Sequence, residues 1–187
     1  MWRTVTALAL FVSTLPAVIG GDYRSAKHKI DQIQFDRAPS GSRITLTANE
    51  LNAWVRAEVP PSVRGAMRGP TLELGHGSAT GFAWIDFVKL RTAQGSPPGW
   101  LLRTLLEGEH PVRVTANVRS GAGRAVVDVQ EVEISGFEIS GRALDYMVRN
   151  FLLPRYPNAK IGEPFEMGHR IERLDIAPAG VGVVIGK

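Results

Sequence analysis

Hydrophobic and polar residues alternate through the middle of the chain. Residues 112–119 read VRVTANVR, so the valines and the alanine fall on one face of a strand while the polar residues fall on the other. Such strict alternation is typical of a strand with one buried face. The pattern predicts an antiparallel sheet whose wet face is basic in this region.

The alternation continues after the turn SGAG and then changes phase. Ala125, Val127 and Val129 place apolar residues at odd-numbered positions, whereas Val132 and Ile134 place them at even-numbered positions. A strand keeps its apolar residues on one face across such a shift only if one extra residue is inserted as a bulge. We therefore expect a hairpin with a bulge near Gln130 that bends the sheet.

Near the amino end, a strand pattern passes directly into a helix pattern. In ITLTANELNAWVRAEVPP, Thr47 and Glu50 have the spacing of a capping box, in which each side chain bonds the other residue's backbone amide. Apolar residues then recur at helical spacing, and two prolines end the pattern. A helix is predicted over residues 48–58, and capping is a sufficient role for Glu50.

A similar unit recurs 93 residues later as FEISGRALDYMVRNFLLP. Ser140 takes the place of the cap Thr47, and a helix is predicted over residues 141–153. Either an internal duplication or the shared rules of capping and helix termination explain the match. Four apolar residues at equivalent positions are expected to be nearly fully buried against the sheet: Leu51, Val55, Leu144 and Val148.

The remaining patterns complete an α+β fold. A third, strongly apolar helix is predicted over residues 97–107, with Ser96 as its cap and an early proline. Strands are predicted in hairpins at 71–75 with 81–90 and at 170–176 with 181–185. Hairpins without βαβ alternation indicate an antiparallel sheet. We expect a strongly curved antiparallel sheet wrapped around two or three helices. The expected divisions of the chain are a linker or first strand at 22–42 and a single α+β domain at 43–187.

Residues 1–20 resemble an export signal. Arg3 precedes an apolar run from Val5 to Leu15, and Val18 and Gly20 fit a cleavage site that would start the mature chain near Gly21. As a helix, residues 4–21 would rise about 27 Å, close to the bilayer core of about 30 Å. The segment is therefore a signal peptide or an uncleaved N-terminal anchor, and we expect the protein in the periplasm or cell envelope.

Composition limits the chemistry. The chain has 187 residues and no cysteine, which excludes disulfides and thiolate sites, and its four histidines lack metal-ligand spacing. The net charge of +4 comes from scattered lysines and arginines, which suits contact with a membrane surface better than a nucleic-acid groove. We expect no metal, no cofactor, no nucleic-acid partner and no catalytic residue.

Three stretches carry a resemblance to a known superfamily. They are LTANELNAWVR, PPGWLLRTLLEGEHPVRVTANV and FLLPRYPNAKIGEPFEMGHRIERLDIAPAGVGVVIG, and together they are similar to small exported bacterial proteins of unassigned function. The layout over residues 44–185 resembles the bacterial members of the tubular lipid-binding (TULIP, SMP-like) superfamily. That resemblance implies a curved antiparallel sheet around helices and an apolar groove. The superfamily has no invariant ligand residues to transfer to this chain.

These patterns favour a noncatalytic envelope protein that binds a lipid or another apolar molecule in a groove. A structural or interaction module of an envelope assembly, with envelope proteins as partners and a filled core, is the alternative. Arg56 and Arg149 are the candidates for an anionic headgroup. Large apolar residues of the last two predicted helices are the candidates for lining the groove: Trp100, Leu101, Leu105, Met147 and Phe151.

Overall fold

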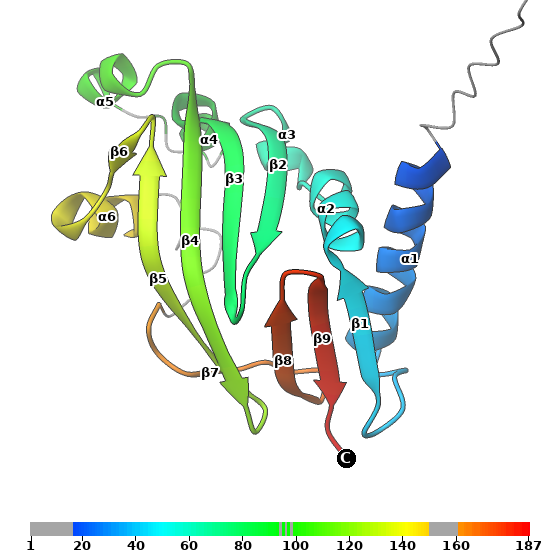
Figure 1. Cartoon of the computed structure of the whole chain (residues 1–187). Helices are drawn as coiled ribbons and strands as arrows, with labels where there is room; N and C mark the ends of the chain where they lie inside the picture. The colour runs from blue at the N-terminus through cyan, green and yellow to red at the C-terminus, as the bar shows by residue number, and fades with distance from the viewer. Residues whose placement is uncertain (1–16, 94, 96, 98, 150–160) are drawn as a thin grey trace, which may run out of the picture.

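Helices and antiparallel strands make up the computed structural model, which describes residues 17–93, 95, 97, 99–149 and 161–187 (Figure 1). The helices are α1 (Ala17–Gln34), α2 (Ala48–Ala57), α3 (Pro61–Arg64), α4 (Phe87–Ala93), α5 (Trp100–Leu105) and α6 (Gly141–Met147). The strands are β1 (Arg43–Thr47), β2 (Met67–Leu74), β3 (Ser78–Asp86), β4 (Glu109–Gly121), β5 (Arg124–Ile134), β6 (Phe137–Glu138), β7 (Phe165–Glu166), β8 (Ile171–Ala177) and β9 (Gly180–Ile185).

The larger sheet has the order β2-β3-β4-β5-β6, with β7 also paired to β5, and every pair is antiparallel. The pairs β2–β3 and β4–β5 are hairpins with short turns, as predicted, whereas residues 87–108, which include α4 and α5, connect β3 to β4. The α+β class with an antiparallel sheet is therefore confirmed, while the strong curvature stays a prediction.

The predicted bulge in β5 is confirmed. Thr115 is opposite Glu131 and Ala116 is opposite Val129, so the register skips Gln130. The extra residue keeps Val127 and Val129 on the same face of the sheet as Val132. That face is apolar over its whole length on β4 and β5 except for His110 and Ser120, near the two ends of β4.

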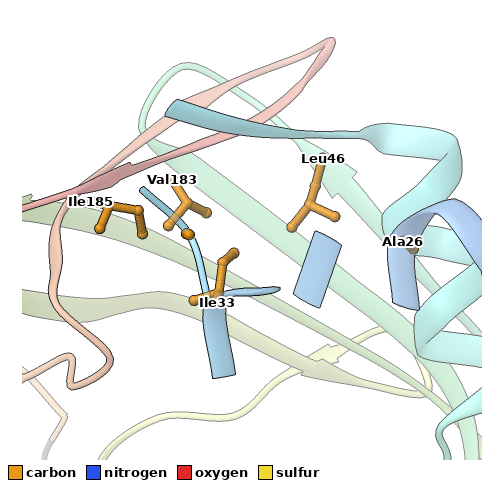
Figure 2. Packing of buried hydrophobic residues seen from close by; sticks show 6 residues of the cluster. Ala26, Ile33, Leu46, Val183 and Ile185 are labelled. Carbon is orange, nitrogen blue, oxygen red and sulfur yellow. The ribbon is translucent and has the colours of Figure 1, made fainter. Parts of the chain in front are cut away.

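The smaller sheet has the order β1-β9-β8 and carries the main hydrophobic core. Figure 2 shows this cluster, in which helix α1 packs against β1 and β9. Ile185 is the most deeply buried large side chain there, with 1% of its surface exposed. The buried members are Ala26, Ile33, Ala38, Leu46, Val183 and Ile185.

The edge strand β8 forms hydrogen bonds with two turns and one side chain of the larger sheet. The backbone amides of Gly77 and Gly123 donate to the carbonyls of Ile176 (3.1 Å) and Glu172 (2.9 Å). Between them, the Ser120 hydroxyl accepts from the Leu174 amide (2.7 Å) and donates to its carbonyl (3.0 Å). These bonds satisfy the outward backbone groups of β8 and join the two sheets.

Residues 22–34, predicted as linker or first strand, instead form most of helix α1, so that prediction is wrong for this segment. The buried contacts of α1 come from Ala26 and Ile33, one face of a helix at a spacing of seven. A small alanine gives little hydrophobic signal in the sequence, although a neighbouring helix can approach it closely. Because α1 begins at Ala17, cleavage after Gly20 would remove its first turn.

Helix α2 confirms the predicted capping box: Thr47 caps the helix through the Glu50 amide, and the Glu50 carboxylate accepts from the Thr47 amide. The predicted burial of Leu51, Val55, Leu144 and Val148 is wrong, because all four are half-buried. The fully buried residues of α2 are Glu50 and Ala53 instead. Helix α1 packs against α2, and this contact buries the side of α2 that carries Glu50 and Ala53.

The other predicted helices need smaller corrections. Helix α5 starts at Trp100 rather than residue 97, because Gly99 is its cap and accepts from the Arg103 amide (3.0 Å). In the second repeat, Ser140 occupies the cap position of α6 but makes no side-chain capping bond. Of the predicted helix 141–153, residues 150–153 lie outside the described part of the chain.

The strand predicted over 81–90 ends early, at Asp86. The Asp86 carboxylate accepts from the Lys89 amide (2.9 Å), which starts helix α4 at Phe87. An aspartate in this position satisfies an orphan amide of the first helical turn. Phe87 and Val88 therefore belong to a helix and not to the strand, and Phe87 is buried, with its ring centroid 6.0 Å from that of His110.

Asn52 docks α2 on the outer edge of β2. Its side-chain amide donates to the Leu72 carbonyl (2.8 Å) and accepts from the Leu72 amide (2.8 Å), as a neighbouring strand would. We expect Asn52→Ala to lower the free energy of unfolding by about 2 kcal/mol, since two partly buried backbone groups lose their partners. Asn49→Ala, an exposed asparagine on the same helix, should change it by less than about 0.5 kcal/mol. Equal urea midpoints for the two variants would contradict this role.

Candidate functional site

An apolar cavity of about 430 Å³ lies at the end of the larger sheet that carries α5 and α6 (Figure 1). We call it the apolar pocket. Its volume lies within the usual range for small-molecule sites. It is lined by Leu106, His110, Ile134, Ser135, Phe137, Ile139, Ala143, Tyr146 and Met147.

The strands supply the floor of the pocket. His110, at the start of β4, and Ile134, at the end of β5, both belong to the apolar face of the sheet. Ser135 and Gly136 then form a two-residue turn, with φ of 53° and 82°, that reverses the chain into β6. Left-handed conformations at both central positions are the usual solution for so tight a hairpin.

Helix α6 supplies the opposite wall. Ala143, Tyr146 and Met147 are spaced by three and four residues, so they lie on one face of the helix. Ile139 leads into this helix, and its backbone amide donates to the Val132 carbonyl (2.7 Å), which ties the connection to β5. The pocket is therefore built mainly from the second strand–helix unit of the chain.

Large apolar side chains remain exposed around the pocket. Phe137 has 73% of its surface exposed, and Trp100 on α5 has 81%. Exposed aromatic residues of this size near an apolar cavity are uncommon on a protein with no ligand or partner. Both residues belong to elements at this end of the sheet, Phe137 to β6 and Trp100 to α5.

A second cavity of about 300 Å³ adjoins the apolar pocket through Tyr146, which lines both. We call it the arginine pocket. Arg142, Asp145 and Arg149 are the other described residues that line it, and the Arg149 guanidinium lies 4.0 Å from the Asp145 carboxylate. Arg142 makes no ion pair with any described residue. One side of the site is thus apolar and the other carries two cations and one carboxylate.

The predicted groove residues are only partly brought together. Met147 lines the apolar pocket, whereas Trp100 is exposed and does not line it. The side chains of Leu101 and Leu105 are outside the described atoms, and Phe151 lies outside the described residues. Sequence reasoning missed Phe137 and Tyr146. Their signal was available as the two aromatic residues of the segment FEISGRALDYM, residues 137–147.

The two predicted headgroup arginines lie in different places. Arg149 lines the arginine pocket, next to the apolar pocket. Arg56 instead lines a polar cavity of about 410 Å³ between α1, α2 and β2, together with Asp22 and Glu73. Of the two predicted arginines, only Arg149 therefore lines a cavity that shares a residue with the apolar pocket.

Glu50 has a larger role than capping, because it is the centre of a buried polar cluster between α1 and α2. Lys29 lies 2.7 and 2.8 Å from its two carboxylate oxygens, and Ser25 also donates to it. Burial acts to raise the pKa of Glu50, but the bonds from Lys29, Ser25 and the Thr47 amide outweigh burial and hold its pKa below the ordinary value. A carboxylate with so many donors is structural and is a poor general base.

Two further observations concern metals and membranes. Within the residues that the structure describes, histidine, aspartate and glutamate nowhere form a group of three that could hold a metal ion. The described helices also include none that is long and apolar enough to cross a membrane.

No family model and no curated protein match the chain. The resemblance to the tubular lipid-binding superfamily therefore stays a prediction from sequence motifs.

Proposed function

We propose that the protein is a noncatalytic binding protein for an amphipathic, lipid-like ligand. The observation that carries the proposal is that Tyr146 lines both an apolar pocket and a pocket with two arginines. The apolar part of the ligand would occupy the first pocket. Its anionic group would lie near Arg142 and Arg149 in the second.

Charge and exposure support the assignment of an anionic group to the arginine pocket. The side chain of Arg149 is 72% exposed and only loosely paired with Asp145, so its guanidinium can contact a ligand without breaking a close ion pair. Guanidinium groups bind carboxylates and phosphates with two parallel hydrogen bonds. The sequence features of residues 1–20 support export, and we propose the cell envelope as the place of binding.

A second candidate function, an interaction module of an envelope assembly, is favoured by one observation. Trp100 and Phe137 are far more exposed than aromatic residues of a free protein usually are. Tryptophan and phenylalanine are common anchors of protein interfaces. In this alternative the same surface contacts another protein, and the apolar pocket receives one of its side chains.

Extraction of the purified full-length protein separates the two functions. Organic solvent should release a lipid or fatty acid in an amount approaching one molecule per chain, identified by mass spectrometry of the extract. Native mass spectrometry of the unextracted protein should show the same added mass. An extract without lipid, together with a stoichiometric protein partner in the native spectrum, would contradict ligand binding and support the interaction module.

A further inference from the structure

Two polar side chains contact each other inside the apolar pocket. The Nδ1 atom of His110 lies 3.0 Å from the Oγ atom of Ser135, and both residues line the cavity. The second ring nitrogen of His110, Nε2, is buried and has no hydrogen-bond partner among the described residues. The hydroxyl of Ser135 likewise has no other partner in the described part of the chain.

The buried Nε2 atom favours one direction for this hydrogen bond. A neutral histidine carries one proton, on either Nδ1 or Nε2. A proton on Nε2 would leave a buried N–H donor without an acceptor, which is rarer and more costly than a bare lone pair. The proton is therefore better placed on Nδ1, which then donates to the Ser135 oxygen.

This direction of the hydrogen bond determines what the Ser135 hydroxyl can do. If its oxygen accepts from His110, its own O–H is left to donate elsewhere. Ser135 is an exposed residue of the turn that lines the pocket, so this donor is available to a molecule bound there. A hydroxyl without an acceptor in an otherwise apolar cavity favours a ligand that brings an acceptor oxygen.

We propose, on the basis of the function proposed above, that the pocket selects acyl ligands with a carbonyl or carboxylate oxygen at the β5–β6 turn. Ser135 binds this oxygen by donating its hydroxyl hydrogen. His110 is a positioning residue, which acts by holding the Ser135 hydroxyl in the donating orientation. A plain hydrocarbon chain fits the cavity but leaves this donor unpaired.

The test uses the full-length protein and a neutral naphthylamine dye that fluoresces in apolar surroundings. Competitors are the methyl ester of a medium-chain fatty acid and an alkylbenzene of equal length, which lacks the acceptor. Because the ester is uncharged, Arg142 and Arg149 contribute little to the comparison. The ester should displace the dye at about 2- to 10-fold lower concentration than the alkylbenzene.

Ser135→Ala should remove this preference, measured as the ratio of the ester and alkylbenzene concentrations that displace the dye from the same variant. Alanine keeps the Cβ atom, so the left-handed turn is no more strained than before. His110→Phe should reduce the preference as well, and it repeats the test if the first variant fails to fold. Ser140→Ala, an exposed serine outside the pocket without a capping bond, is the matched control and should retain the preference.

The outcomes separate the two proposals. A dye that binds the wild-type protein but is displaced equally by ester and alkylbenzene would overturn the role of Ser135 and leave ligand binding intact. Retention of the preference for the ester by both Ser135→Ala and His110→Phe would also overturn the role of Ser135 and leave ligand binding intact. A wild-type protein that binds neither the dye nor the ester would overturn the proposed function itself.

Discussion

Replacement of Lys29 by methionine is expected to lower the free energy of unfolding by about 3 kcal/mol at neutral pH. Lys29 is the only cation within bonding distance of Glu50 in the described structure, and the Glu50 side chain is 7% exposed. Methionine keeps the aliphatic stem against α2 but leaves the carboxylate buried without a counter-charge. Removal of one partner of a buried pair is among the most costly single changes.

The loss should depend on pH in a defined direction. The folded-state pKa of Glu50 lies below the ordinary value, so its contribution to stability is complete above the unfolded pKa of about 4.3 and is lost as the pH falls through the folded pKa. Without Lys29, burial is opposed by fewer bonds and the pKa rises. The difference between wild type and variant should therefore be largest at neutral pH and shrink in acid.

Urea unfolding at neutral and acid pH measures both effects. Lys27→Met is the matched control, because Lys27 is on the same helix and forms an exposed ion pair with Asp31. Exposed pairs contribute little, so its effect should be clearly smaller. Equal midpoints for the two variants at neutral pH, or a difference that grows in acid, would show that Glu50 is not held by Lys29.

Local rules predicted much of the sheet and of helix α2. The capping box at Thr47 and Glu50 depends only on residues three apart, and its bonds are present in the structure. The bulge at Gln130 follows from a phase change within one strand. Such features are encoded by neighbours in the sequence, so no knowledge of the tertiary fold is needed to find them.

Features that depend on distant residues were not predictable in this way. The burial of Glu50 results from Lys29 and Ser25 on α1, a helix whose buried face includes the small Ala26. Once α1 occupies that flank, Leu51 and Val55 are only half-buried. The face of α2 that becomes core is thus decided by packing between elements, which its own periodicity does not specify.

The candidate site also depends on residues that are distant in the sequence. Met147 and Arg149 were found from their place in the apolar and polar faces of one predicted helix, and both line the adjoining pockets. His110, by contrast, is 25 residues from Ser135, and their contact depends on the pairing of β4 with β5. A cavity made by a strand end, a turn and a helix face has no signature within any one segment.

Replacement of Ala143 by tryptophan is expected to weaken binding in the apolar pocket by about 100-fold or more. Ala143 is exposed on α6 and lines the pocket, so an indole there would occupy ligand space without displacing core residues. A steric conflict of about 3 kcal/mol corresponds to that loss in affinity. Because the change is at an exposed position, the fold should survive.

Ala57→Trp is the matched control, since Ala57 is an exposed alanine at the end of α2, away from α6 (Figure 1). Circular dichroism should give the same helix and strand content for both variants and the wild type. The two substitutions add the same side chain to the surface. Any difference in ligand binding between them therefore reports on the apolar pocket.

Titration of a neutral naphthylamine dye and of a medium-chain fatty acid into these three proteins tests ligand binding in the apolar pocket most directly. We predict saturable binding of both ligands to the wild type and to Ala57→Trp, displacement of the dye by the fatty acid, and loss of both from a folded Ala143→Trp. Equal binding to all three proteins, or no saturable binding to the wild type, would contradict the apolar pocket as a lipid-binding site.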